Sequence, residues 1–416
     1  MPNQSVIVNI GQIATLAGPA RPRVGSEMRE LGLLTDAALL IEDGLVVAAD
    51  SYRDLQHRIK GDATMIDAQQ RLVTPGFVDA HTHLVFAGNR AAEFEKRIGG
   101  ATYQEIAAAG GGIQSTVSLT RKATEEDLLV EARKHRDWML RGGTTTLEAK
   151  SGYGLDRETE LRILRVLATL ADEGPVSIIP TLLAAHTVPK EFTDRREEYL
   201  SLIIDELIPE VAALGLARYC DAFCDDHAFT VSETRRVLQA ADAHGLGLRL
   251  HAEQFRPGTG AALAAELHSV TVDHLETVTD ETLQLLLAAG VQPVLLPASV
   301  FCLGRDQYPP ARRMIDMGLP VVIATDFNPG SSPAPSMPFT LSLASIQMKM
   351  LPAESLCAAT INAAWSLGLG TITGSLEQGK DADFLIHECD DYRELAYYVA
   401  APARPRVFIA GREVTP

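Results

Sequence analysis

The middle of the chain alternates short apolar, β-branched runs with helix-like segments, and this alternation limits the possible folds more than any other feature. Parallel strands need crossover connections, and one helix after each strand is the usual solution. Eight strands alternating with helices over roughly 250 residues predict an α/β fold, the (β/α)8 TIM barrel. The expected strands span residues 72–80, 144–149, 176–183, 219–223, 246–251, 269–274, 291–296 and 320–325.

The segments between these runs have helical patterns and end at glycines. Thr124 followed by Asp127 approximates a capping box, which favours a helix start. A doubly wound open sheet is the structural alternative, but no glycine-rich phosphate-binding sequence follows the first strand. The clearest helices are expected at residues 125–141, 157–171, 197–213, 232–243 and 279–289.

The two ends of the chain are rich in strand-like sequence. Asp43-Gly44 between apolar runs is a strong hairpin signal, and Gly411 marks a second turn. We therefore expect a small β-sandwich domain formed from both chain termini, residues 1–70 plus 375–416, beside a barrel of residues 71–374. The expected terminal strands lie at residues 5–10, 37–48, 382–387 and 405–414.

Composition excludes several classes of protein. The net charge of −17 argues against nucleic acid and anionic membranes as partners, because phosphates attract basic surfaces. The 5 scattered cysteines do not form a disulfide pattern. We find no signal-peptide pattern and no apolar run long enough to span a bilayer. A cytoplasmic protein that acts on a small molecule is the expectation.

Polar, metal-capable residues stand where several of the expected strands end. His81 and His83 follow the first strand, and on an extended chain residues two apart face the same side, so both can reach one metal ion. His251, His274 and Asp326 end the fifth, sixth and eighth strands. Taken singly, a histidine at such a position is more often an ordinary buried residue than a metal ligand. Function in a barrel lies at this end of the strands, so the whole set predicts a site there.

The sequence PGFVDAHTHL, with His251, His274 and Thr325-Asp326 at the ends of later strands, resembles the metal-dependent amidohydrolase superfamily over most of the chain. The resemblance implies one metal ion per chain, zinc or iron. Its implied ligands are His81, His83, His251 and Asp326, with His274 beside the reacting water. Lysine is absent from the expected fourth strand, where binuclear relatives carry a bridging ligand; Asp225 or Asp226 is the alternative if the strand boundary is different.

Longer strings are similar to the imidazolonepropionase family, notably LEAKSGYGL, LLAAHTVP, HAEQF and TDFNPGSSP. That resemblance implies hydrolysis of the ring C–N amide bond of 4-imidazolone-5-propanoate to N-formimidoyl-L-glutamate, a step of histidine degradation, by a homodimer. It implies contacts with the substrate from Arg90, Tyr153, His186, Gln254, Asn328, Gly330 and Ser331.

Chemical roles follow from the superfamily resemblance and from the residue types. A bound metal lowers the pKa of its water, Asp326 can carry a proton from that water to the leaving ring nitrogen, and His274 can stabilise the oxyanion. Gln254 is a third candidate catalytic residue, although an amide cannot act as a general base. Arg90 can pair with the propionate. Glycines 110–112 form either a lid hinge or a simple flexible loop.

Two rival functions remain open at this point. A heterocycle deaminase of the same superfamily, such as a guanine deaminase, would share the five metal-site residues, but the longer strings argue against it. A non-catalytic barrel that binds a partner would be expected to have lost metal ligands, and the full set is present here.

Overall fold

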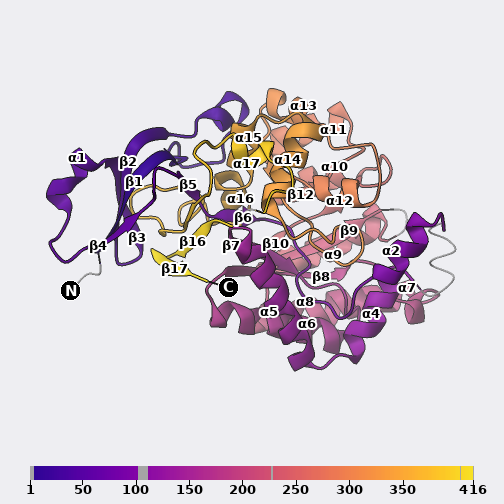
Figure 1. Cartoon of the computed structure of the whole chain (residues 1–416). Helices are drawn as coiled ribbons and strands as arrows, with labels where there is room; N and C mark the ends of the chain where they lie inside the picture. The colour runs from indigo at the N-terminus through magenta and orange to yellow at the C-terminus, as the bar shows by residue number, and fades with distance from the viewer. Residues whose placement is uncertain (1–3, 102–110, 226–227, 403, 416) are drawn as a thin grey trace.

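A computed structural model describes residues 4–101, 111–225, 228–402 and 404–415, and Figure 1 shows two parts, a terminal sheet and a larger barrel. The barrel strands pair in parallel in the order β14-β13-β12-β11-β9-β8-β7-β6, with β10 beside β9. This confirms the predicted fold class. The strands are β6 Phe77–Asp79, β7 Thr144–Lys150, β8 Ser177–Ala185, β9 Tyr219–Cys224, β10 Gly247–Leu248, β11 His251–Ala252, β12 Thr271–His274, β13 Gln292–Leu295 and β14 Val322–Ile323.

The first and last strands meet and close the barrel. Buried Asp79 of β6 accepts hydrogen bonds from the Thr325 backbone N–H at 3.1 Å and from its hydroxyl at 2.6 Å. Beyond the strands, the Asp326 N–H donates to the His81 carbonyl at 3.1 Å and the His83 N–H donates to the Phe327 carbonyl at 2.8 Å. These contacts hold the ends of strands one and eight together, where the first two histidines leave the barrel.

The expected first strand, residues 72–80, is divided in the structure. Leu72–Pro75 forms β5, which pairs with β1 and β15 of the terminal sheet, whereas β6 begins at Phe77 and pairs with β7. Gly76 separates them, and a Cβ there would overlap the Thr145 side chain. A continuous apolar run does not reveal that its two halves belong to different sheets. We propose that the boundary between the N-terminal strands of the terminal sheet and the barrel lies at Gly76.

The helices of the barrel lie mostly where the sequence predicts them. Thr124 accepts from the Asp127 N–H, and the Asp127 carboxylate accepts from the Thr124 N–H, so the predicted capping box begins α5. The expected helix 197–213 is interrupted by a π-helical turn, η4 Leu202–Leu207. The larger helices are α2 Ala91–Ile98, α4 Ile113–Lys122, α5 Glu125–Arg141, α6 Arg157–Glu173, α7 Arg196–Ser201, α8 Ile208–Leu214, α9 Val231–Ala243, α10 Gly260–Glu266, α11 Asp280–Ala289, α12 Pro297–Cys302, α13 Ala311–Met317, α14 Met337–Met348, α15 Pro352–Ala358 and α16 Ile361–Ser366.

Strands from both termini form a second sheet, in the order β17-β16-β15-β5-β1-β2-β3, with β4 also beside β1. Asp43 and Gly44 both have positive φ, at 52° and 84°, as the predicted hairpin turn requires. Phe384 and Phe408 stack at 4.4 Å within a cluster that both ends supply. The strands are β1 Gln4–Ala14, β2 Leu33–Glu42, β3 Leu45–Ser51, β4 Thr64–Asp67, β5 Leu72–Pro75, β15 Phe384–Ile386, β16 Arg406–Ile409 and β17 Arg412–Val414. Short helical turns towards the two ends of the chain are η1 Gly25–Arg29, α1 Tyr52–Leu55, η2 Gln56–Arg58 and α17 Glu394–Tyr397, and η3 Lys190–Phe192 lies between β8 and α7 of the barrel.

The terminal sheet and the barrel share apolar packing. Leu385 and Val407 of the terminal strands belong to the main hydrophobic cluster, together with Phe77 and Leu147 of the barrel. Among the described residues, no helix is both long and apolar enough to cross a membrane. Gly110, the first of the three glycines predicted as a lid hinge, lies outside the described residues.

Candidate active site

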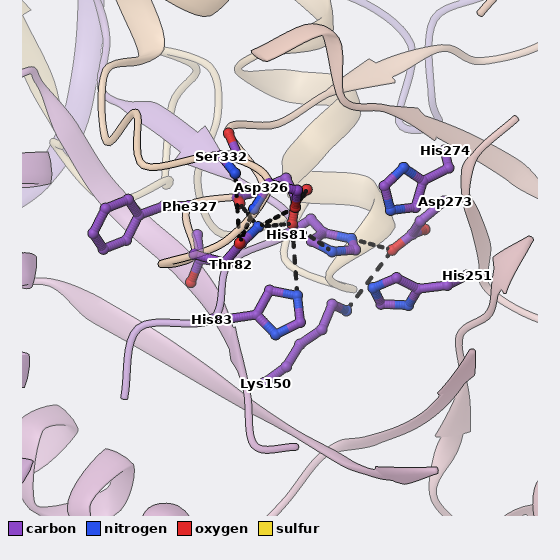
Figure 2. Close-up of polar contacts among 12 residues, drawn as sticks. His81, Thr82, His83, Lys150, His251, Asp273, His274, Asp326, Phe327 and Ser332 are labelled. Carbon is purple, nitrogen blue, oxygen red and sulfur yellow. Dashed lines mark hydrogen bonds and ion pairs between the residues drawn. The ribbon is translucent and has the colours of Figure 1, made fainter. Parts of the chain in front are cut away.

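The five predicted metal-site residues gather inside the carboxyl end of the barrel, as Figure 2 shows. His81 and His83 follow β6, His251 begins β11, His274 ends β12 and Asp326 follows β14. Each is buried, with between 0% and 3% of its surface exposed. The topology causes the convergence, because parallel strands of a barrel all end at the same rim.

Two overlapping triads of these side chains could hold a metal ion. His81, His251 and His274 form one, and His81, His83 and Asp326 form the other; within each, the potential ligand atoms lie within 4.8 Å of one another. The buried Nε2 atom of His81 has no hydrogen-bond partner among the described residues and lies 3.5 Å from Asp326 Oδ1. Buried nitrogen and carboxylate atoms in this arrangement fit a metal such as zinc.

The imidazole rings are oriented by carboxylates that the sequence analysis did not identify. His81 Nδ1 lies 2.6 Å from Asp273 Oδ2, and His251 Nδ1 lies 3.0 Å from Asp221 Oδ2. In His81 the hydrogen bond from Nδ1–H to Asp273 leaves Nε2 as the free lone pair, which is the form that binds metal. The close approach of Asp221 to His251 Nδ1 is an ion-pair contact without hydrogen-bond geometry. Burial holds the pKa of His81 well below its usual range, which also favours the neutral ring.

A buried group of charges lies beneath the histidines. Lys150 Nζ is 2.8 Å from both Glu148 and Asp221 and 3.7 Å from Asp273, and all four side chains are fully buried. Burial alone would raise the pKa of Asp221, but the charges of His251 and Lys150 hold it below its usual range. Arg249 Nη2 lies 3.7 Å from Asp273, so a second cation joins the group. These opposite charges compensate one another inside the barrel.

Strand alternation could have revealed this group. Glu148 and Lys150 are two apart on β7, so both point into the barrel, and Asp221 lies in the middle of an apolar strand. Charged residues inside barrel strands are costly unless paired, so their presence is itself a signal. The inward carboxylate of the fourth strand is Asp221. It is neither of the two considered from the sequence, of which Asp226 lies outside the described residues.

His274 and Asp326 differ from the other site residues in backbone conformation, and the pKa of each is raised. Both have positive φ, at 81° and 53°, a conformation that costs L-residues energy and that recurs at active sites. Burial disfavours protonation of His274, but the nearby Glu276 carboxylate, 3.2 Å from Nδ1, raises its pKa overall. Burial raises the pKa of Asp326. The site thus combines a histidine that holds a proton more readily with a carboxyl group that can accept and release one.

A cavity of about 600 Å³ opens over these residues. All seven predicted substrate-contacting residues line it, so the structure brings together groups from five different strand ends. Glu93, Arg97, Phe223, Phe255 and Arg305 add to the lining without having been predicted. The cavity is lined by His83, His251, His274 and Asp326 together with Arg90, Tyr153, His186, Gln254, Asn328, Gly330 and Ser331.

Contacts in the cavity wall fix the orientation of several predicted residues. His186 Nδ1–H donates to the Gly152 carbonyl at 2.9 Å, which leaves Nε2 as the free nitrogen, and burial lowers the pKa of His186 to about 3. Arg90 Nε–H donates to the Thr116 hydroxyl at 2.9 Å. The guanidinium of Arg90 lies against Gly330, where any Cβ would overlap it. A neutral histidine and a cation therefore face the same cavity.

The turn after β14 is held by Asn328. Its Oδ1 accepts from the backbone N–H groups of Gly330 and Ser331, each at 2.8 Å, and its Nδ2 donates to Asp326 Oδ1 at 3.0 Å. The Ser331 hydroxyl lies 3.4 Å from Asp326 Oδ2. Asn328 was predicted to contact the substrate; in the structure its amide is engaged with the turn and with the carboxylate of Asp326.

Comparison with known proteins agrees with this architecture. Residues 72–414 match the amidohydrolase family. An imidazolonepropionase from Solibacter usitatus is 55% identical over 410 residues, covering 99% of this chain and 98% of the relative. One from Geobacillus thermodenitrificans is 46% identical over 407 residues, with coverages of 97% and 96%.

Solved structures share the fold at low identity. An adenosine deaminase from Xanthomonas campestris with bound zinc has a TM-score of 0.70 at 20% identity, covering 99% of this chain and 92% of that one. The guanine deaminase of E. coli has a TM-score of 0.68 at 16% identity, with 99% of both chains covered. The barrel with its buried histidines and aspartate is thus an amidohydrolase scaffold. Within the amidohydrolase family, the chain belongs to the imidazolonepropionases.

Proposed function

We propose that the chain hydrolyses the ring C–N amide bond of 4-imidazolone-5-propanoate to give N-formimidoyl-L-glutamate, in the degradation of histidine. The observation that carries this proposal is the 55% identity to a curated imidazolonepropionase across nearly the whole of both chains. Because the similarity includes the segments that line the cavity, it bears on the substrate as well as on the fold. The reaction adds the oxygen of water to the ring carbonyl carbon and one of its protons to the departing nitrogen.

His81, His83, His251 and Asp326 would hold one metal ion per chain, and their nitrogen and carboxylate donors fit either zinc or iron. When bound, such a metal lowers the pKa of a water molecule into the neutral range and so supplies the nucleophile. The free lone pair of His81 and the carboxylates behind His81 and His251 support this assignment.

Proton transfer in the proposed reaction falls to Asp326 and His274. Asp326 accepts a proton from the attacking water and delivers it to the leaving ring nitrogen, as general base and then as general acid. The Asn328 amide, which donates to Asp326 Oδ1 at 3.0 Å, would hold the carboxylate in place for both roles. His274, which Glu276 keeps more readily protonated, donates to the oxygen of the ring carbonyl as negative charge develops there.

The propionate and the ring would be held by other residues that line the cavity. Arg90 offers a guanidinium that suits a carboxylate through paired hydrogen bonds. Tyr153 and His186 would bind ring atoms, with His186 Nε2 as the acceptor that its bond to Gly152 leaves free. Gln254 lines the cavity and offers an amide that can donate or accept. Gly330 and Ser331 would contact the ligand near Asp326, while Asn328 keeps their turn in place.

The second candidate is deamination of a heterocycle. It is favoured only by the fold, since the adenosine and guanine deaminases above share the barrel at 20% identity or less. We further propose that the protein works in the cytoplasm as a homodimer; this rests on the family resemblance.

Purified, metal-loaded protein tests the proposed function directly. We expect loss of imidazolone absorbance with formation of formimidoylglutamate, and no comparable turnover of guanine. The Arg90→Met variant should lose roughly tenfold to more than a hundredfold in kcat/KM, because a charge-assisted pair contributes about 1.5–3 kcal/mol. A substrate analogue without the carboxylate should be nearly indifferent to that substitution. Efficient turnover of a purine or pyrimidine, with none of the imidazolone, would favour the deaminase instead.

A further inference from the structure

The segment Ser151–Leu155, between β7 and α6, carries Tyr153 and forms part of the cavity wall without regular secondary structure. Its backbone is buried, so its N–H groups need partners inside the protein. The Ser151 N–H donates to the Thr181 carbonyl at 3.0 Å, and a single side chain binds three others: Glu160 accepts from the N–H groups of Gly152 at 3.0 Å, Gly154 at 2.7 Å and Leu155 at 2.8 Å.

Glu160 is an unusual residue for this position. Its side chain has no exposed surface, and no cation among the described residues forms an ion pair with it. Burying a carboxylate is costly: burial raises the pKa of Glu160, and the hydrogen bonds from the backbone N–H groups oppose that shift. Glu160 lies in the first turn of α6, where the helix dipole adds to that compensation. The Glu160 carboxylate is therefore held by hydrogen bonds with Ser151–Leu155 and not, in the described part of the chain, by an ion pair.

Arg121 of α4 holds the carbonyl side of the same segment. Its Nε–H donates to the Gly154 carbonyl at 2.7 Å, and its Nη2–H donates to the Leu155 carbonyl at 3.0 Å. Ion pairs with Asp156 at 2.8 Å and Glu191 at 2.6 Å keep the guanidinium in place. The segment is thus bonded to a carboxylate through its N–H groups and to a guanidinium through its carbonyl groups.

The position of the segment decides the orientation of two cavity residues. Tyr153 lies within it, and the Gly152 carbonyl accepts the Nδ1–H of His186. Gly152 has a φ of +103°, and a Cβ there would lie 2.9 Å from both His186 Nδ1 and the Leu183 carbonyl oxygen. Because packing is this close, movement of the segment shifts the phenol of Tyr153 and the imidazole of His186 together.

We infer that Glu160 and Arg121 are positioning residues, which clamp Ser151–Leu155 so that Tyr153 and His186 are already arranged for the substrate. The inference rests on the proposed function, because it concerns the wall that would hold the imidazolone. A preformed wall lowers the entropy that binding must remove, so misplacement of its groups should weaken substrate binding.

The test compares Glu160→Gln and Arg121→Met with the parent protein. Each variant should raise KM for the imidazolone roughly tenfold or more, in line with the cost of misplaced binding groups. The value of kcat should change much less, and metal content should stay the same. Glu354→Gln is the matched control, because Glu354 is also a fully buried glutamate in the first turn of a helix but pairs with Arg312. It should lower stability and leave KM unchanged.

A double-mutant cycle separates positioning from general stability. Glu160→Gln should cost much less in kcat/KM when Tyr153→Phe and His186→Asn are already present, because Glu160 acts through those side chains. Additive effects, or a KM that matches the parent while only the unfolding temperature falls, would overturn the inference.

Two further outcomes are informative. If Glu160→Gln does not fold, two other measurements decide whether the clamp exists. One is the KM of Arg121→Met, since the Arg121 side chain is 26% exposed in the parent. The other is hydrogen exchange of the parent protein. The amides of residues 152, 154 and 155 should exchange as slowly as those of the neighbouring strands, and rapid exchange would refute the clamp. If the parent protein does not turn over the imidazolone at all, the proposed function fails, while the exchange result still tests the clamp.

Discussion

Asp326 is held so that one carboxylate oxygen faces two histidines. Its Oδ1 lies 3.5 Å from His81 Nε2 and 3.6 Å from His83 Nε2, and Asn328 donates to the same oxygen at 3.0 Å. We expect Asp326→Asn to lower kcat by about 10²–10⁴, because an amide cannot accept a proton from water. The measurement is steady-state kinetics with metal analysis of the same sample. A variant that retains metal and has nearly normal kcat would show that Asp326 does not carry the proton.

His274 should have a smaller but distinct effect. We expect His274→Ala to lower kcat by about 10²–10³, the range for removing one donor to a developing oxyanion. The parent histidine is buried beside Glu276. The His274→Gln variant should recover part of the lost activity, because glutamine retains a hydrogen-bond donor. Equal losses in the two variants would argue against hydrogen bonding as the role of His274.

His387 of the terminal part is a buried histidine outside the site. Burial lowers its pKa to about 3, and its Nε2 lies 2.8 Å from the Thr74 hydroxyl. An unfolded chain has a histidine pKa of about 6.5, so between these values the unfolded state binds more protons. The stability that neutral His387 contributes is therefore complete above about pH 6.5 and is lost progressively as the pH falls toward 3.

Comparison of the parent with His387→Gln isolates this effect. The difference in the free energy of unfolding should change by about 1.4 kcal/mol for each pH unit between the two pKa values, and should be constant above neutrality. Urea titrations at several pH values measure it. Parallel curves for the two proteins from pH 7 to pH 4.5 would mean that His387 titrates normally in the folded state.

At the scale of elements, the second, fourth and sixth barrel strands are connected by charges. Lys150 of β7, Asp221 of β9 and Asp273 of β12 meet inside the barrel, and the two aspartates contact histidines of the proposed metal site. We expect Asp221→Asn to weaken metal binding about 10–100-fold, the usual cost of removing a carboxylate behind a ligand histidine. Metal affinity by competition with a chelator is the measurement, and Asp383→Asn, a buried carboxylate of the terminal part, is the control. Unchanged affinity in Asp221→Asn would leave Asp221 with a purely structural role.

The connections between elements build much of the cavity wall on a barrel that other proteins share. The deaminase structures share the barrel, yet identity to them is 20% or less. In this chain the segment after β7, the turn after β14 and helix α4 each contribute to the cavity wall through side chains that hold backbone groups. We expect substrate preference to depend on how these connections are held, because loops on a rigid barrel tolerate variation.

For the whole molecule, a metal ion would connect the ends of strands that are distant in sequence. The ligand residues follow or begin β6, β11 and β14, so binding should stabilise only the folded barrel. Removing the metal with a chelator should abolish turnover, leave the far-UV circular dichroism unchanged and lower the unfolding temperature. The free energy involved is about 2.7 kcal/mol when free metal is at 100 times its Kd. An unfolding temperature independent of metal would contradict this ligand set.

Much of the fold and the site could be predicted from the sequence because both follow a repeating pattern. Alternating strands and helices determined the barrel, and the rule that barrel strands end at one rim located His81, His83, His251, His274 and Asp326 together. Local signals were equally reliable where they depend on neighbouring residues alone, as with the capping box at Thr124 and the hairpin at Asp43-Gly44. These features are determined by short-range geometry, so the sequence contains them.

Only the tertiary structure decided the contacts between residues far apart in the chain. The division at Gly76, the pairing of Asp221 with Lys150 and the two charged residues around Ser151–Leu155 depend on which strands and helices become neighbours. A buried charge needs groups that compensate it, and those can lie far away in the sequence, as with Lys150 and Asp273, which are 123 residues apart. Periodicity shows that a side chain points inward, but packing alone determines what it meets there.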